Sequence, residues 1–413
     1  MDQTTAKSGK QDAPKGKEYV SICPECIIRL LEKPHLYDIG KDELYEINNG
    51  ALEFLAQCDG SHRLDQLKPE PDFLKFCLEE GILSLDPELR GSAQPRPGSP
   101  VPLLSPSLRY LDLQITTRSN IQYPHCRQKP DCRQKPACIQ DLSPAIIQQA
   151  LTEFDRLQGL KVLICGGDPL LHPNIEEILK SLSKVKLRKI IQTNGILVTL
   201  RTVRLLKGII QEVQITLDGL KKGHEYFWGK GTFEQTLAAI QLCRSEGFEV
   251  SVTTLLHREN LNEIKELSPL LLDLGVKEWG INIAQDNSPN ARDRFFGLTP
   301  EQVAPCLKFA FGGSFHGGTE GFTCGSHQLT VIPDGSVCKC GFYAENPVGH
   351  IREGLGRCWA RLTHIPLTRL SCSSCSYLEE CGGGCRKRAE TELGPDPIMC
   401  AFYKQKSQEE NKA

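Results

Sequence analysis

The sequence lacks the features that would tie it to nucleic acid, to a membrane or to export. Its 413 residues carry 49 Lys and Arg against 51 Asp and Glu, so it has no basic excess for binding nucleic acid or anionic membranes. No apolar run approaches the roughly 18 residues that span a bilayer. Residues 1–17 are polar and lack the apolar core of a signal peptide. We therefore expect a cytoplasmic protein with no nucleic-acid partner and no membrane partner.

Cysteine is the residue that the sequence has in excess. Hydrophobic residues make up 39% and charged residues 24%, which is ordinary for a soluble globular protein of two or three domains. The 19 cysteines are not ordinary, because disulfide-rich secreted proteins are short chains with an export signal. In a reducing compartment, many cysteines indicate metal or redox chemistry.

The first part of the chain divides into a tail, a small domain and a linker. Residues 1–17 indicate a flexible tail. Residues 18–90 predict an α+β domain, in which two extended runs meet at Gly40, Lys41 and Asp42 and helical patterns follow at 48–58 and 72–83. Residues 91–106 hold five prolines and two glycines, which is typical of an extended linker.

Residues 107–300 alternate between strand and helix patterns. Ser143 and Pro144 are the N-cap and first residue expected of the helix over 142–157. Six βα repeats imply a parallel sheet with helices outside it, and they are too few for a closed eight-stranded barrel. We expect an α/β fold, a partial barrel or a doubly wound sheet, with ligands at the C-terminal ends of its strands. The strand candidates are residues 110–116, 161–165, 188–193, 212–217, 248–255 and 278–284.

Residues 301–413 form a cysteine-rich extension. Short separations such as Cys372-x2-Cys375-x5-Cys381-x3-Cys385 suit thiolates that wrap one metal centre or interleave around two. Four thiolates at tetrahedral corners suit an iron–sulfur cubane and zinc equally, so the spacing leaves both open. Buried free cysteines would not produce such a pattern. The cysteines are Cys324, Cys338, Cys340, Cys358, Cys372, Cys375, Cys381, Cys385 and Cys400.

The order of these cysteines resembles the seven-cysteine SPASM extension of radical S-adenosylmethionine (SAM) enzymes. The resemblance implies two auxiliary [4Fe-4S] clusters held in interleaved fashion. The first would be ligated by Cys324, Cys340 and Cys385, and the second by Cys372, Cys375, Cys381 and Cys400. The motif does not fix a fourth ligand for the first cluster. Cys306 and Cys338 are candidates, unless the position stays open for substrate, and Cys358 is expected to be structural.

The middle of the chain strengthens this resemblance. Residues 166–169, GGDP, follow a strand as the GGEP-type motif of radical SAM barrels does, although alone they could form an ordinary turn. The resemblance implies that Gly166, Gly167, Asp168 and Pro169 bind the methionyl amino group of S-adenosyl-L-methionine, since glycines let the backbone approach a ligand. It also implies that later strand ends line the SAM side of the barrel, through Thr193, Asn194, Thr216 and Asp218.

The chain departs from the family where the catalytic cluster is expected. The first strand should lead into cysteines spaced Cx3Cx2C, but Ser119 and Tyr123 occupy the first two positions and only Cys126 matches. One thiolate cannot hold the cluster that reduces SAM, and oxygen ligands are hard substitutes for a soft site. We therefore predict that this chain lacks the catalytic [4Fe-4S] cluster and does not cleave SAM.

A duplicated hexapeptide follows at this point. CRQKPD at 126–131 is repeated as CRQKPA at 132–137, which places Cys126, Cys132 and Cys138 at x5 spacing. The loop is either a rewired cluster site or a tandem duplication without a function. The second interpretation is favoured, because x5-x5 is not a known cluster spacing.

The N-terminal domain resembles the PqqD-like peptide-recognition domain over about residues 30–85. In that family a small winged-helix unit binds the leader of a precursor peptide as an added strand at a sheet edge. A generic winged helix is the alternative, although no basic recognition helix is present. Cys23 and Cys26 form an isolated CxxC, which could be half of a metal site or a redox pair. A non-metal role is favoured because no second pair is near.

Three functions are compatible with these patterns. The favoured hypothesis is a non-catalytic relative that binds a precursor peptide, carries auxiliary clusters, and assists an active radical SAM protein by electron transfer or scaffolding. An electron donor is a further expected partner. The alternative is an active peptide maturase that forms C–C or C–S crosslinks through an unusual cluster site. The third is a zinc-binding scaffold.

Overall fold

The computed structural model describes residues 17–89, 105–121, 139–283, 297–312 and 321–410. The chain forms two compact units, an N-terminal unit up to Leu103 and a C-terminal unit from Leu104 onward. Within the described ranges, no helix has the length and apolar character needed to cross a membrane.

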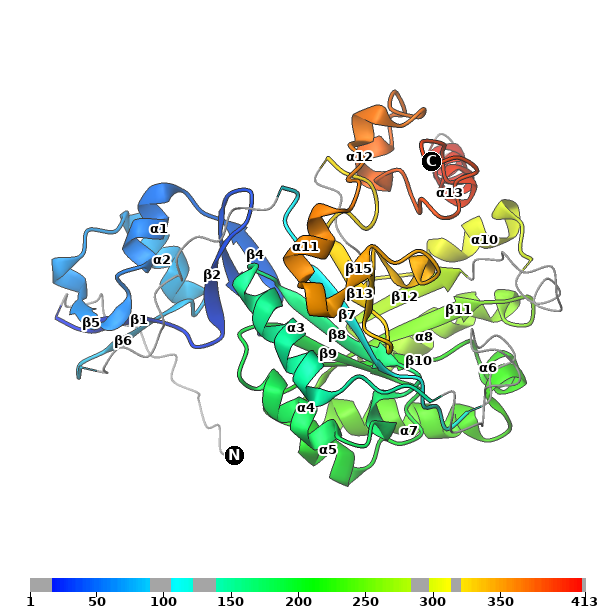
Figure 1. Ribbon diagram of the computed structural model, residues 1–413, viewed down its shortest axis with the longest axis horizontal. Coiled ribbons are helices and arrows are strands. Elements are labelled where there is room, and N and C mark those ends of the chain that lie inside the picture. The colour runs from blue at the N-terminus through cyan, green and yellow to red at the C-terminus, as the bar shows by residue number, and fades with distance from the viewer. Residues whose placement is uncertain (1–16, 90–104, 122–138, 284–296, 313–320, 411–413) are drawn as a thin grey trace, which may run out of the picture. The chain divides into compact units, whose positions relative to one another are not determined.

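The N-terminal unit contains two antiparallel three-stranded sheets and two helices (Figure 1). The expected hairpin joins β3 to β4, and its turn uses Asp42 at a positive φ of 64°, where the carboxylate accepts the Tyr37 hydroxyl at 2.7 Å. Asn48 caps α1 by accepting the Ala51 N–H at 2.8 Å. The elements are β1 (Tyr19–Ile22), β2 (Cys26–Leu30), β3 (Pro34–Asp38), β4 (Glu43–Glu46), α1 (Asn49–Leu55), β5 (Asp59–Arg63), α2 (Pro71–Glu79) and β6 (Leu83–Asp86).

The C-terminal unit is built on one nine-stranded sheet. Strands β7 to β12 are parallel, and each pairs with the one before it, so the α/β partial-barrel prediction is confirmed and the doubly wound alternative is wrong. The elements up to β12 are β7 (Tyr110–Thr116), α3 (Pro144–Arg156), β8 (Lys161–Gly166), α4 (Ile175–Leu182), β9 (Arg188–Thr193), α5 (Leu200–Leu206), β10 (Glu212–Thr216), α6 (Lys221–Trp228), α7 (Thr232–Ser245), β11 (Glu249–Leu256), α8 (Ile264–Asp273) and β12 (Glu278–Ile283).

The two faces of this sheet differ in chemistry. Leu111, Leu113 and Ile115 of β7 alternate into the main core beneath the helices, which run along one side of the sheet in Figure 1. The other face carries a small apolar cluster of Leu163, Cys165 and Ile190 and, beside it, polar side chains. There Gln192 Nε2 donates to Gln214 Oε1 at 3.0 Å across β9 and β10. The open side of the partial barrel therefore offers hydrogen-bonding side chains.

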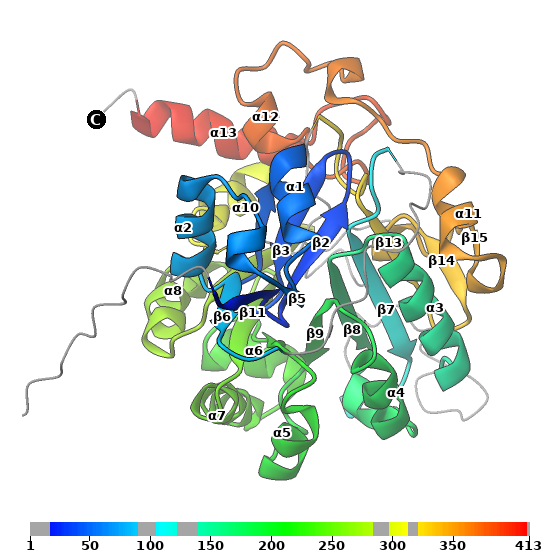
Figure 2. The ribbon, with the colours of Figure 1, turned by 90° about the vertical axis from the view of Figure 1, so that its left-hand side faces the viewer.

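The cysteine-rich extension continues the same sheet. Strand β13 pairs in parallel with β7, and β14 and β15 add antiparallel strands beyond it. Helices α12 and α13 lie side by side in Figures 1 and 2. Two contacts join this part of the chain, because Tyr377 stacks on Tyr403 at 4.9 Å between ring centroids and Lys406 pairs with Glu380 at 2.6 Å. The elements are α10 (Pro300–Leu307), β13 (Gln328–Val331), β14 (Ser336–Cys338), β15 (Gly349–His350), α11 (Leu355–Ala360), α12 (Leu378–Cys381) and α13 (Pro397–Glu410).

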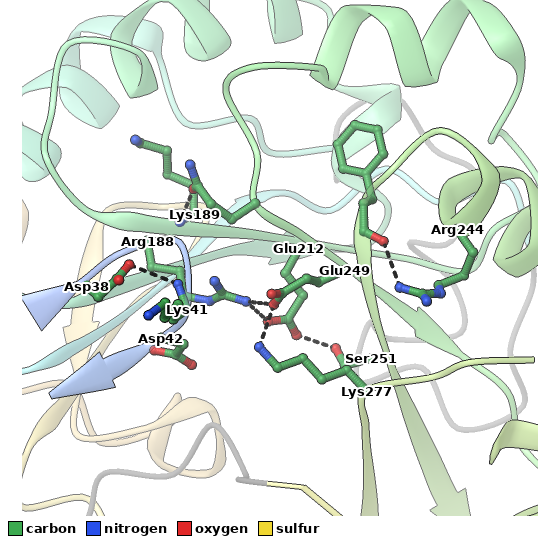
Figure 3. Close-up of polar contacts among 12 residues, drawn as sticks. Asp38, Lys41, Asp42, Arg188, Lys189, Glu212, Arg244, Glu249, Ser251 and Lys277 are labelled. Atoms are coloured by element: carbon green, nitrogen blue, oxygen red, sulfur yellow. Dashed lines mark hydrogen bonds and ion pairs between the residues drawn. The ribbon is translucent and has the colours of Figure 1, made fainter. Parts of the chain in front are cut away.

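A buried ion network lies at the N-terminal ends of the parallel strands (Figure 3). The Arg188 side chain is fully buried, and its guanidinium donates to Glu212 Oε2 at 2.9 Å and to Glu249. Lys277 Nζ lies 2.8 Å from Glu249 Oε2 on the half-exposed side of the network. This end of a parallel sheet contributes to stability, because ligands bind at the opposite end.

Candidate cofactor and metal sites

Two glycines end strand β8 against the backbone that follows β7. A Cβ on Gly166, whose φ is +131°, would lie 2.4 Å from the Thr116 carbonyl oxygen, and one on Gly167 would lie 2.0 Å from the Arg118 oxygen. The Gly167 N–H donates to Thr116 at 2.8 Å and the Asp168 N–H to Arg118 at 2.7 Å. Glycine is therefore required here by the close approach of the protein's own chain.

The Asp168 carboxylate ties the end of β8 to the end of β9. It is buried and accepts the Thr193 hydroxyl at 2.8 Å, the Leu170 N–H at 3.0 Å and the Asn194 N–H at 3.4 Å. Burial raises the pKa of Asp168 above its ordinary value, although these hydrogen bonds act to lower it. Pro169 then begins a short 3-10 turn. Asp168 therefore ties the two strand ends together through its side chain.

Asn194 extends this network to both neighbouring segments. Its Nδ2 donates to Asn120 Oδ1 at 2.7 Å, in the chain after β7. Its carbonyl accepts the Thr236 hydroxyl of α7 at 3.2 Å. Asn194 is buried, and it therefore fixes β9 between the chain after β7 and α7.

Asp218 forms a second buried centre just after β10. Its carboxylate accepts the Leu255 N–H at 2.7 Å and Trp228 Nε1–H at 2.8 Å, and burial raises its pKa to about 6. The Asp218 N–H donates to His224 Nδ1 at 3.1 Å, and burial lowers the pKa of His224 to about 3, so this ring is neutral. Thr216 ends β10 and is half-buried.

The structure thus gathers the eight predicted SAM-side residues at the C-terminal ends of β8, β9 and β10. The hydrogen bonds of Asp168, Asn194 and Asp218 described above all go to protein groups. Contact between these residues and SAM stays a prediction.

The predicted catalytic-cluster loop is described only at its start. The Ser119 hydroxyl donates to the Ile121 carbonyl at 3.0 Å and accepts the Ile121 N–H at 3.2 Å, so it closes a local turn. Tyr123, Cys126, Cys132 and Cys138 lie outside the described residues. The serine at the first cluster position therefore has a partner in its own backbone.

Cys324, Cys340 and Cys385 are neighbours in the C-terminal unit. Burial raises the pKa of Cys340 to about 12, and the charges of Cys324 and Cys385 add to this rise. Burial also raises the pKa of Cys324, with Cys385 adding to it. These three thiols, from before β13, after β14 and after α12, therefore lie within electrostatic reach of one another.

The other four predicted ligands form a separate group. Burial raises the pKa of Cys381 to about 11, with Cys400 and Cys372 adding to the rise. The pKa of Cys400 is raised by burial, then by Cys372, with Cys375 also adding. The two groups have the same members as the two sets that the SPASM resemblance implies. Ligation of clusters by these groups stays a prediction.

The donor chemistry suits a thiolate-bound metal centre, but the thiols do not form a chelate as they stand. In the part of the chain that the structure describes, no group of three or more His, Cys, Asp or Glu side chains could hold a metal ion. Burial raises the pKa of Cys324, Cys340, Cys381 and Cys400, which favours the protonated thiol at these four positions, whereas thiolates are the metal-binding form. Metal binding would therefore release protons and draw each group together.

Cationic side chains near the first group were missed by the sequence analysis. Lys339, Arg386 and Arg388 all act to lower the pKa of Cys324. Arg388 Nη2 lies 2.6 Å from Asp396 Oδ2, and Asp396 in turn accepts the Cys385 N–H at 2.8 Å. The basic run after Cys385 was the available signal. These cations favour the accumulation of negative charge on the first group.

Other cysteines lie in different surroundings. Cys306 Sγ contacts the Gln302 carbonyl at 3.8 Å within α10, and burial raises the pKa of Cys338 to about 11 with Asp334 adding. The fourth ligand of the first group stays a prediction, with Cys306 and Cys338 as candidates. Cys358 contacts the His350 carbonyl at 3.7 Å, in keeping with a structural role.

The N-terminal CxxC pair is poorly suited to redox chemistry. Burial raises the pKa of Cys26 to about 12, with Asp38 and Cys23 adding to the rise. A thiol with so high a pKa is a weak nucleophile.

Comparison with known proteins identifies the central region. Residues 124–271 match the radical SAM superfamily, and the match begins after Ser119 and Tyr123. The AdoMet-dependent heme synthase of Oleidesulfovibrio alaskensis is 24% identical over 73% of this chain and 89% of its own. The subtilosin biosynthesis protein AlbA of Bacillus subtilis is 27% identical over 62% of this chain and 61% of its own. The mycofactocin maturase MftC of Mycolicibacterium smegmatis is 24% identical, over 70% of this chain and 81% of the MftC chain.

Solved structures share the fold. Streptococcus suis SuiB bound to S-adenosylmethionine superposes with a TM-score of 0.61 at 15% identity, covering 92% of this chain and 99% of that one. SuiB bound to its precursor peptide SuiA gives a TM-score of 0.63 at 14% identity over the same shares of the two chains. At such low sequence identities, the similarity to these structures shows a shared fold alone.

Proposed function

We propose, from the premise that this chain contains a radical SAM domain, that it works in the maturation of a ribosomally made precursor peptide without cleaving SAM itself. In this role it binds the precursor peptide, carries two auxiliary [4Fe-4S] clusters, and assists an active radical SAM protein that shares its electron donor. Relatives named as a bacteriocin biosynthesis protein and a mycofactocin maturase support the peptide substrate.

The first cluster position carries the proposal. An iron–sulfur cluster that binds SAM needs three thiolates, so that one iron stays free for the substrate. At the first position Ser119 offers a hydroxyl that is already bonded to Ile121. With Tyr123 at the second position, Cys126 is the single thiolate left in the motif. The strand-end bonds of Gly167 and Asp168 then serve to maintain the fold.

The N-terminal unit is proposed to hold the leader of the precursor peptide. Each of its two sheets has three strands, so among the described residues of this unit the outer strands have one neighbour each. Such a strand offers backbone groups to an extended peptide. This part of the proposal follows the PqqD-like resemblance of residues 30–85.

The test is anaerobic reconstitution with iron and sulfide, followed by dithionite and SAM. We expect no 5′-deoxyadenosine above a control without SAM, and its detection would overturn the proposal. The Ser119→Cys/Tyr123→Cys variant should gain about four iron atoms, because three thiolates then anchor a cubane. The matched control, Ser119→Ala/Tyr123→Phe, changes the same positions without adding thiols and should gain none.

An active maturase with a rewired site is the second candidate, and the duplicated hexapeptide favours it. Its ligands would be Cys126, Cys132 and Cys138. Replacing all three by alanine should leave the iron content unchanged under the main proposal and lower it under this one. Metal analysis of the anaerobically purified protein separates both from a zinc scaffold.

A further inference from the structure

Three buried hydrogen-bond donors accompany the first cysteine group without an acceptor. They are the Thr323 and Ser326 hydroxyls, on either side of Cys324, and the Nε–H of Arg386, next to Cys385. Thr323 and Ser326 are 0% exposed and Arg386 is 5% exposed. No acceptor for them is found within the described residues. A buried donor left unpaired costs about 1–3 kcal/mol, so three near one centre indicate an absent acceptor.

The charge of Arg386 is also unbalanced within the described part of the chain. Its guanidinium donates to backbone carbonyls only, those of Gly383, Glu392 at 3.3 Å and Gly394 at 2.6 Å. Arg388, two residues on, is paired with Asp396. A buried cation without an anion is costly, so the missing acceptor is expected to be anionic.

The position of Arg386 indicates where that anion lies. Arg386 directly follows Cys385 of the first group in the chain, and the Gly383 carbonyl that accepts its hydrogen bond lies between Cys381 of the second group and Cys385. Its guanidinium is therefore held beside the segment that carries ligands of both cysteine groups. Sulfur atoms of a thiolate-bound cluster accept hydrogen bonds and carry negative charge, so they meet both requirements.

We propose that Thr323, Ser326 and Arg386 donate to sulfur atoms of the centre held by Cys324, Cys340 and Cys385, and that these donors raise its reduction potential. Donors and positive charge stabilise the more negative, reduced state. The inference rests on the proposed auxiliary clusters, and it assigns residues outside the cysteine motif to their tuning.

The test uses the full chain, reconstituted anaerobically with iron and sulfide and titrated with dithionite under EPR detection. Thr323→Val and Ser326→Ala should each lower the midpoint of one transition. A tenfold loss in the reduction equilibrium corresponds to 59 mV for one electron. The affected transition should be the one that disappears in Cys340→Ala. Thr323→Ser keeps the hydroxyl and should keep the parent midpoint.

The matched control is Ser373→Ala, which removes an exposed hydroxyl between Cys372 and Cys375 and should move neither midpoint. Iron content distinguishes a failure of the proposed clusters from a failure of the proposed tuning role. A parent protein without about eight irons contradicts the auxiliary clusters themselves. With iron intact, unchanged midpoints in both variants, or equal shifts of both transitions, overturn the tuning role. Loss of iron from both variants also overturns it, because the hydroxyls would then support the peptide fold.

Discussion

Replacement of Gly167 by alanine tests the geometry at the end of β8. The new Cβ would lie 2.0 Å from the Arg118 oxygen, 2.6 Å from its carbonyl carbon and 3.0 Å from the Thr117 carbonyl carbon. All three are backbone atoms, so no side chain can rotate away. The chain after β7 must move instead. That movement stretches the bonds from the Gly167 and Asp168 N–H groups, now 2.8 and 2.7 Å.

The expected cost of Gly167→Ala follows from these contacts. Overpacking at a site that cannot relax costs about 1–3 kcal/mol. Each of the two weakened backbone bonds adds about 1 kcal/mol. We therefore expect the free energy of unfolding of the C-terminal unit to fall by about 3–5 kcal/mol.

Urea unfolding followed by tryptophan fluorescence measures this loss. The three tryptophans, Trp228, Trp279 and Trp359, all lie in the C-terminal unit, so the signal reports that unit alone. Gly280→Ala is the matched control, because a Cβ on Gly280 of β12 meets no atom within 4 Å. It should change stability by less than about 1 kcal/mol. Equal unfolding midpoints for the two variants would refute the strand-end geometry.

Two further predictions concern buried charges of the C-terminal unit. Arg188→Met leaves Glu212 and Glu249 without their buried cation and should cost about 3–5 kcal/mol in the same assay, whereas Lys277→Met on the half-exposed side should cost under about 1 kcal/mol. Equal losses would contradict the network. Burial raises the pKa of Asp112 to about 7, so the folded state holds this proton more tightly than the unfolded state. The resulting stability is complete below about pH 4 and is lost as the pH rises through 7. The Asp112→Asn variant should not lose this stability as the pH rises. If its urea unfolding midpoint falls with pH as steeply as that of the parent protein, the prediction is wrong.

Local patterns were sufficient to predict much of the fold. Alternation in residues 110–116 predicted β7, and the Ser143–Pro144 pair predicted the start of α3, because both signals depend on neighbours in sequence. The pairing of β13 with β7 could not be predicted in this way. It joins Gln328 to Tyr110, far apart in the chain, and it depends on tertiary packing.

Residue identity predicted the location of the candidate site. It did not predict the hydrogen-bonding partners of the side chains in that site. The GGDP motif located Asp168, but no local pattern indicated that its carboxylate accepts hydrogen bonds from Thr193 and Asn194. Arg386 was missed for the same reason. A basic residue after Cys385 is unremarkable until the fold shows that it is buried against carbonyl groups.

We expect residues 321–326 and 365–400, called here the cysteine segment, to depend on the proposed clusters for stability more than the barrel does. Its own apolar cluster contains three buried side chains, those of Ile365, Leu367 and Leu370, whose burial contributes about 1.5–3 kcal/mol each. Against this stand the unpaired Arg386 and the unsatisfied hydroxyls of Thr323 and Ser326, which oppose the packed state while no anion is present. Formation of an anionic thiolate centre removes those costs at once. We therefore expect binding of the proposed clusters and ordering of this segment to be one coupled process, whereas strands β7 to β12 belong to the main core.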